Sequence, residues 1–193
     1  MITYDQRGHG DNTDRNVSFG IFEKRDVEAL VDYAKAELGA QFIVVHGQSM
    51  GGQTAALYAA TEHASNQIDA VILDSPLPGL ELFMKLMFLE DGCSEMEAEA
   101  ILICGKVYSN IVAGMKFEDG DTMEQAKKIT VPCMVIVSEK DDVCLPEYVE
   151  EVYDYVASSN KMIMRVDSKH IEGVIDHPQE YFDGVFRFLD SVR

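Results

Sequence analysis

This sequence contains side chains suited to act as a nucleophile, an acid and a base, and they occur in the order Ser49, then Asp141 or Asp142, then His170. A serine hydroxyl is a weak nucleophile until an imidazole takes its proton, and the imidazole works best when a carboxylate fixes its tautomer. Ser49 is the centre of a G-x-S-x-G motif, the residues GQSMG from Gly47 to Gly51. These residue types in this order predict nucleophilic catalysis on an acyl group.

The segments on either side of the motif decide whether it means more than a chance glycine turn. Residues 42–45 form an apolar, β-branched run, and an alanine-rich segment without a helix breaker follows Gly52. Strand, tight turn and helix is the setting of a nucleophile elbow, in which the serine occupies a strained turn. Small residues two before and two after Ser49 would let strand and helix pass closely. We therefore interpret Ser49 as the nucleophile.

Short apolar runs alternate with amphipathic segments along the rest of the chain. Strands are expected at residues 1–5, 42–45, 68–73, 131–137 and 161–166. Helices are expected at residues 27–38, after the motif, at 95–115, from Pro146 and from Pro178, where proline suits a first helical turn. Such alternation predicts a single α/β domain over residues 1–193, with a mostly parallel sheet of about five strands flanked by helices.

In an open α/β sheet, the loops after the carboxyl ends of the strands converge on one crevice. Ser49, an acid from Asp141 or Asp142, and His170 each follow a different expected strand. Counting back from Pro146 favours Asp142, so the choice of acid stays open at this point. Less favoured alternatives are Asp74 as the acid and His177 as the base, the latter because it immediately precedes an expected helix start.

Residues 77–130 differ in character from the alternating segments around them. This stretch is rich in methionine and apolar residues and contains a long helical pattern. Such a stripe is more often packing surface than binding site, but an apolar helical insertion between two core strands is also what a lid would look like. We expect a small helical lid here, with an acyl chain hinted at by Leu82, Phe83, Met87 and Phe88.

Composition limits the classes of partner. The formal net charge of −18 argues against nucleic acid and anionic membrane surfaces, although a solubilising acidic surface would give the same value. The four cysteines form no disulfide framework or metal-binding pattern. Without a signal peptide or a membrane-spanning run, the expected location is the cytoplasm. The expected partner is a small-molecule ester, with no metal or organic cofactor.

The chain resembles the α/β-hydrolase superfamily, in its bacterial esterase and lysophospholipase-like branch. The matching segments are YDQRGHGDN from Tyr4, HGQSMGG from His46, VILDSP, VPCMVIVSEKDD from Val131, and His170 with the helix after it. By resemblance, Ser49 is the nucleophile, His170 the base and Asp141 the acid, since Ser138 aligns with the glycine of a G-x-x-D pattern. Met50 would supply one oxyanion N–H. The resemblance implies a serine hydrolase acting on an ester or thioester.

The resemblance begins at what would be the family's fourth strand. The family's first three strands, and the loop that supplies its second oxyanion N–H, have no counterpart before Met1. Losing one such donor costs about a hundred- to a thousandfold in turnover. The alternative function is therefore a weak or silent α/β-hydrolase-fold fragment that serves as a binding or assembly module. The strand at residues 42–45 would expose an edge, which predicts homodimerisation through that side.

Overall fold

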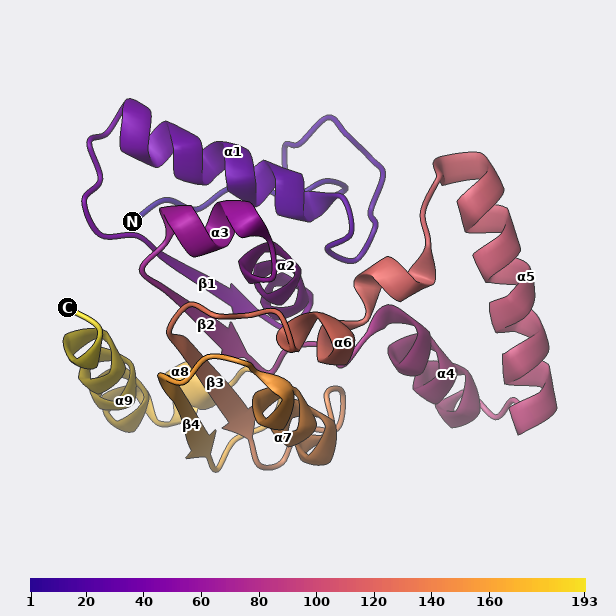
Figure 1. Ribbon diagram of the computed structural model, residues 1–193. Coiled ribbons are helices and arrows are strands. Elements are labelled where there is room, and N and C mark those ends of the chain that lie inside the picture. The colour runs from indigo at the N-terminus through magenta and orange to yellow at the C-terminus, as the bar shows by residue number, and fades with distance from the viewer.

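The computed structural model describes residues 1–193, and its elements alternate between helices and parallel strands (Figure 1). Four strands form one sheet, and eight of the helices lie between or after them. In chain order the elements are α1 (Glu23–Ala36), β1 (Val44–Gln48), α2 (Met50–Ala59), α3 (Glu62–Gln67), β2 (Ala70–Asp74), α4 (Leu80–Glu90), α5 (Glu95–Ala113), the 3-10 turn η1 (Phe117–Gly120), α6 (Thr122–Ala126), β3 (Cys133–Ser138), α7 (Pro146–Tyr155), β4 (Lys161–Val166), α8 (Gly173–Asp176) and α9 (Pro178–Ser191).

The sheet is parallel throughout, in the order β1-β2-β3-β4. Register pairs Val44 with Ala70 between the first two strands, and Cys133 with Lys161 between the last two. All residues of β2 and β3 are buried, as in a parallel sheet covered on both faces. The parallel α/β class is therefore confirmed. All four carboxyl ends point to the same edge, so the loops that follow them meet there.

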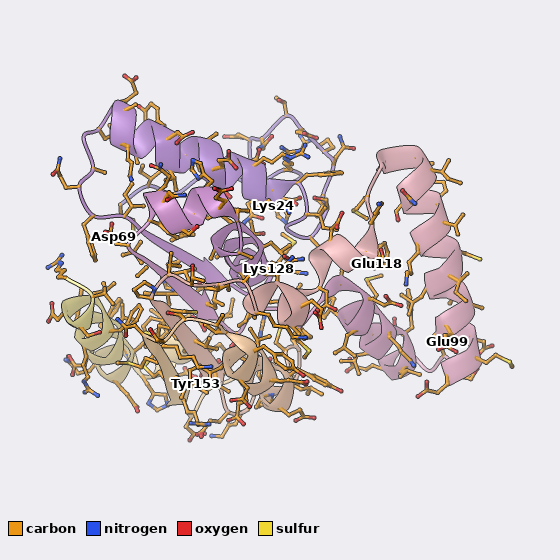
Figure 2. All side chains as sticks on the ribbon, viewed as in Figure 1. Lys24, Asp69, Glu99, Glu118, Lys128 and Tyr153 are labelled. Carbon is orange, nitrogen blue, oxygen red and sulfur yellow. The ribbon has the colours of Figure 1, made fainter.

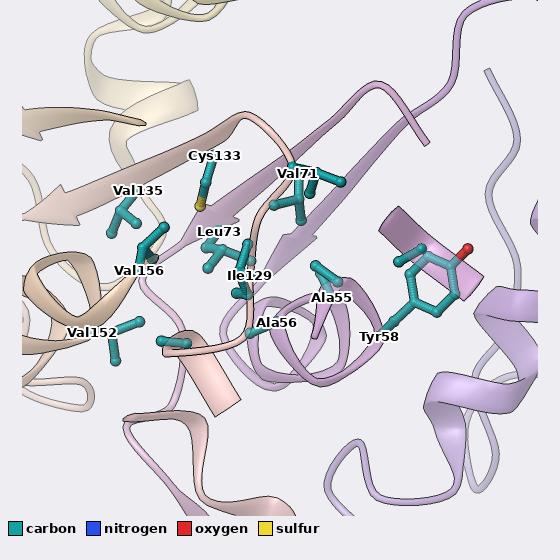
Figure 3. Packing of buried hydrophobic residues seen from close by; sticks show 14 of the residues in the cluster. Ala55, Ala56, Tyr58, Val71, Leu73, Ile129, Cys133, Val135, Val152 and Val156 are labelled. Atoms are coloured by element: carbon teal, nitrogen blue, oxygen red, sulfur yellow. The ribbon is translucent and has the colours of Figure 1, made fainter. Parts of the chain in front are cut away.

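Helices cover the two faces of the sheet unequally. On one face, Val71, Leu73 and Val135 pack against helices α1, α2, α6 and α7 in the larger apolar core (Figure 3). On the other face, Ile72 and Ile136 pack with residues of α9. Successive strand residues point to opposite faces, which is why neighbouring positions of β2 belong to different cores. No helix is long and apolar enough to cross a membrane.

The segment between β2 and β3 holds α4, α5, η1 and α6. Figure 1 shows α4 and α5 as a pair that projects to one side of the sheet, while α6 lies against the body. Figure 2 shows side chains pointing outward from α5, with Glu99 on its first half and Glu118 on η1. Two ion pairs join the helices, Lys106–Glu81 at 2.8 Å and Lys85–Glu95 at 2.9 Å. Helices thus occupy much of residues 77–130, and the interpretation of this segment as a lid insertion stays a prediction.

The prediction of a strand at residues 1–5 is wrong. This segment is exposed and pairs with no strand, which leaves four strands where about five were expected. A groove of about 950 Å³ lies between residues 1–6 and β1, with Val31 and Leu38 also in its wall. Strand-like residues form a strand only when a neighbour satisfies their backbone groups, and the groove separates these from β1. Self-association through the free edge of β1 stays a prediction.

Candidate active site

Ser49 occupies the turn between β1 and α2. Its backbone has φ 54° and ψ −121°, in a region that non-glycine residues seldom adopt. The Ser49 N–H donates to the carbonyl of Asp74 at 2.9 Å, and its carbonyl accepts from Gln53 N–H at 3.0 Å. These bonds hold the turn from both sides. The side chain makes no capping bond to α2, so Oγ is free to face the loops after the strands.

The glycines of the motif do not contribute equally to the turn. A Cβ on Gly47 would lie 2.0 Å from the carbonyl oxygen of Gly51, so this position excludes any side chain. A Cβ on Gly51 would meet only the Nε2 atom of Gln6, at 3.7 Å, which is ordinary contact. A Cβ on Gly52 would lie 3.0 Å from Cα of Pro76. The close approach of β1 and α2 therefore requires glycine at positions 47 and 52. The expectation that a small residue at position 51 is also needed for this approach is wrong.

The structure brings His170 to Ser49 from the loop after β4. Its Nε2 lies 2.7 Å from Ser49 Oγ, and its Nδ1 lies 2.7 Å from Oδ2 of Asp141. An ionised carboxylate only accepts hydrogen bonds, so Nδ1 carries the proton. Nε2 of the neutral imidazole is then the acceptor for the Ser49 hydroxyl. This tautomer is the one that a general base for Ser49 requires.

Asp141 is buried and fully engaged. Its Oδ1 accepts from the N–H groups of Val143, at 2.9 Å, and Cys144, at 2.8 Å, which leaves Oδ2 for His170. Burial by itself would raise the pKa of this carboxyl, but the bonds from His170 and the two N–H groups lower the pKa below its ordinary value. Lys140 N–H also donates to the carbonyl of Ser168 at 2.9 Å, which ties the two loops together.

The alternatives considered from sequence lie elsewhere. Asp142 is exposed and makes no hydrogen bond to His170. His177 is the N-cap residue of α9, as expected of a helix start, and its Nε2 lies 3.1 Å from the carbonyl oxygen of Asp167. Asp74 is buried under the turn and is bonded to other side chains. Tertiary contacts thus select Asp141 as the carboxylate that reaches the histidine.

A buried polar cluster beneath the turn was not anticipated from sequence. The Asp74 carboxylate accepts from Gln48 Nε2 at 2.8 Å and from the Tyr181 hydroxyl at 2.7 Å. Burial and the neighbouring carboxylate raise the pKa of Tyr181 well above its ordinary value. Gln48 directly precedes Ser49, and Tyr181 lies on α9. The shared bonds to Asp74 therefore connect the turn at Ser49 to α9. Gln48, Asp74 and Tyr181 lie on β1, β2 and α9, and no local sequence pattern links them.

Helix α2 presents donors to the crevice beside Ser49. Its first residues, Met50, Gly51 and Gly52, precede the first intrahelical bond, so their N–H groups have no partner within the helix. Met50 N–H is the donor expected next to the nucleophile. The structure places no three His, Cys, Asp or Glu side chains where they would hold a metal ion.

The lowered pKa of Asp141 predicts how an Asp141→Asn variant responds to pH. The folded state favours the carboxylate, so its stabilising contribution is full above the ordinary value of 3.8 and is lost as the pH falls through the lowered pKa. The difference in unfolding free energy between wild type and Asp141→Asn should be constant above about pH 5 and shrink toward about pH 3. Urea unfolding across this range measures it. Asp142→Asn, at an exposed position, should have the same dependence of unfolding free energy on pH as the wild type. If the difference in unfolding free energy between wild type and Asp141→Asn did not change with pH, the lowered pKa of Asp141 would be contradicted.

Comparisons with known proteins bear on the fold of the chain. A family model for the alpha/beta hydrolase fold matches residues 1–91. An esterase of Pyrococcus furiosus, Pf2001, superposes with a TM-score of 0.74 at 21% identity, over 97% of this chain and 69% of its own. The chain has the α/β-hydrolase fold. A monoacylglycerol lipase of Paleococcus ferrophilus shares this fold with it at a TM-score of 0.66 and 19% identity, over 98% of this chain and 82% of the lipase.

A curated relative extends the similarity over the whole α/β-hydrolase-fold chain. The uncharacterized protein YqkD of Bacillus subtilis (strain 168) is 24% identical over 194 residues, which is 100% of this chain and 63% of the relative. The chain therefore spans less than two thirds of the length of the curated relative it matches. An enol-lactonase of Burkholderia xenovorans also has this fold, with a TM-score of 0.65 at 21% identity, over 97% of this chain and 79% of its own.

Proposed function

We propose that this chain is a serine hydrolase that cleaves a carboxylic ester or thioester of modest size. The observation that carries the proposal is the continuous hydrogen-bonded series Ser49–His170–Asp141, with both links at 2.7 Å. The names of two structural neighbours, an esterase and a monoacylglycerol lipase, favour ester substrates.

The reaction follows from these atoms. Ser49 Oγ attacks the carbonyl carbon while its proton passes to His170 Nε2, and Asp141 stabilises the resulting imidazolium. The carbonyl oxygen becomes an oxyanion that accepts from Met50 N–H. When the tetrahedral intermediate collapses, the alcohol or thiol leaves with the proton from His170 and the acyl group stays on Ser49. Water, deprotonated by His170, then releases the acid and restores the serine.

The insertion formed by α4 and α5 fits the role of a lid over an apolar acyl group. Phe83 on α4 packs against the main core, whereas Met87, one turn further along the same helix, is exposed. The first part of α4 thus joins the core that covers the sheet, while later side chains of the insertion face solvent. We propose that substrates carry an acyl chain that these side chains cover.

An active-site-directed fluorophosphonate tests the proposal. We expect it to label the folded chain once, on Ser49, with loss of labelling in Ser49→Ala and full labelling in Ser65→Ala, a variant of an exposed serine on α3. Mass spectrometry of peptides locates the adduct. A folded wild-type chain that stays unlabelled would overturn the hydrolase proposal and favour the alternative, a silent binding or assembly module.

A further inference from the structure

Helix α5 is apolar on two opposite faces. Its inner face buries Ala98 and Leu102. Its outer face presents a row of exposed apolar side chains, which we call the outer stripe: Ile103, Cys104, Val107, Tyr108, Ile111 and Val112. A helix that is apolar all round is normally buried on every side. The sequence of α5 therefore predicts a contact on the outer stripe as well as on the inner face.

The outer stripe exposes a large apolar area. Ile111 is 79% exposed, Tyr108 68% and Ile103 61%, and Figure 2 shows side chains pointing outward along α5. Met96 and Ile101, nearer the start of the helix, are exposed as well. Large apolar side chains have roughly 150 to 250 Å² each to bury, so the total is on the order of 800 Å². Monomers rarely expose an apolar patch above about 600 Å², whereas each partner in a stable dimer buries about 800 Å².

Charges are nearly absent from this part of α5. From Ala100 to Ala113 the helix has one charged residue, Lys106. Its Nζ is bonded to Glu81 at 2.8 Å and lies 3.4 Å from Glu118, so this charge is already paired. The whole chain has a formal net charge of −18, which repels anionic lipid surfaces and nucleic acid. The outer stripe therefore suits a partner whose contact surface is itself apolar and uncharged.

The outer stripe has the shape of two ridges with a hollow between them. Residues four apart form the two ridges, which are Ile103, Val107 and Ile111, and Cys104, Tyr108 and Val112. These six side chains line a hollow of about 390 Å³. When helices pack, such a ridge on one helix fits the groove on the other. A second copy of α5 supplies a ridge of this kind, so the outer stripe is complementary to itself.

We propose that the outer stripe is a self-association surface, on which α5 of a second copy of this chain packs antiparallel about a two-fold axis. The carboxylates of α5, those of Glu95, Glu97 and Glu99, all lie near its N-terminal end. Parallel packing would bring them against their copies. Antiparallel packing places them beside the C-terminal end of the other α5, where Lys116 follows the helix. Charge thus selects the antiparallel arrangement.

This surface is separate from the free edge of β1. Figure 1 shows α5 at the far end of the projecting insertion, away from β1. The proposal also does not depend on the hydrolase activity, because no residue of the outer stripe belongs to the Ser49–His170–Asp141 series.

Sedimentation equilibrium of wild type and Ile111→Glu tests the proposal. At about 0.15 M salt, which screens repulsion between the acidic copies beyond about 8 Å, we expect wild type to dimerise with a micromolar Kd. Ile111→Glu would bury an unpaired carboxylate in the interface and should raise Kd at least about a hundredfold. Ile175→Glu, which changes a similarly exposed isoleucine on α8, is the matched control and should keep the wild-type Kd.

Crosslinking with a short bismaleimide tests the orientation. The two cysteines that are not buried are first removed by Cys93→Ser and Cys104→Ser. Val107→Cys, in the middle of the outer stripe, should then crosslink to its copy. Met96→Cys is also exposed but should not crosslink, because antiparallel packing separates the two copies of this position by about 35 Å. Equal crosslinking at both positions would overturn the antiparallel arrangement.

Three results would overturn the proposed surface. The first is a wild-type chain that stays monomeric up to about 0.5 mM. The second is a dimer that Ile111→Glu leaves intact, which would favour the β1 edge. The third is a monomer that cosediments with phosphatidylcholine vesicles and loses this binding in Ile111→Glu, which would assign the outer stripe to a lipid surface. Fluorophosphonate labelling of Ser49 is measured separately, so failure of the hydrolase proposal is distinguishable from failure of this one.

Discussion

His170→Ala is expected to lower kcat for ester hydrolysis by roughly 10⁴- to 10⁶-fold, the range seen when a serine hydrolase loses its general base. In the intact site, His170 Nε2 lies 2.7 Å from Ser49 Oγ and is the group that takes the hydroxyl proton. The variant removes this acceptor, so the hydroxyl loses its general base. The Asp141 carboxylate would remain bonded to Val143 and Cys144, so the loop should keep its conformation. Steady-state hydrolysis of p-nitrophenyl butyrate, with circular dichroism to show folding, measures the effect.

His177→Ala is the matched control for this prediction. Its ring contacts the carbonyl of Asp167 rather than Ser49, so kcat should not change. If His177→Ala lost activity while His170→Ala kept it, the base would be His177, and the assignment of His170 would be wrong. Equal activity in both variants would remove the histidine from the proposed mechanism.

Gly47→Ala is expected to destabilise the fold by about 3 to 5 kcal/mol, at the upper end of single substitutions. The added methyl would lie 2.0 Å from the Gly51 carbonyl oxygen and 2.4 Å from its carbonyl carbon, both backbone atoms of α2. No side-chain rotation relieves such a contact, so the start of α2 must move away from β1. That movement would also displace Ser49, and we expect activity to be lost with stability.

Gly51→Ala belongs to the same motif and gives the control. Its methyl would lie 3.7 Å from a side-chain atom, so unfolding by urea should occur near the wild-type midpoint. If Gly47→Ala were as stable as Gly51→Ala, the close approach of β1 and α2 would not be a property of the folded protein.

Local sequence determined most of the secondary structure. The strand expected at residues 161–166 coincides with β4, and the prolines at 146 and 178 open α7 and α9 as expected. These elements follow from alternation, helical periodicity and the fixed φ of proline, all of which act within a few residues. The rule that strand ends converge also indicated which loops would meet, because it depends only on the parallel arrangement.

Tertiary structure decided what depends on partners distant in the chain. Residues 1–5 have a strand-like sequence but no neighbour to pair with, so they stay outside the sheet. Asp141 and Asp142 are adjacent and chemically identical, and only the N–H groups of Val143 and Cys144 hold the first one toward His170.

The hydrogen bonds around the Ser49 turn were also decided by tertiary structure and not by local sequence. Gln48, Asp74 and Tyr181 come from three separate elements, and no local pattern links them. Gln6 and Gly51 are likewise far apart in sequence and meet only across the groove. The sequence alone determined the residue types, their order and the secondary structure that carries them. The distances that select between neighbouring candidates were decided only by the packing of the folded chain, because burial and hydrogen-bond partners are properties of the whole molecule.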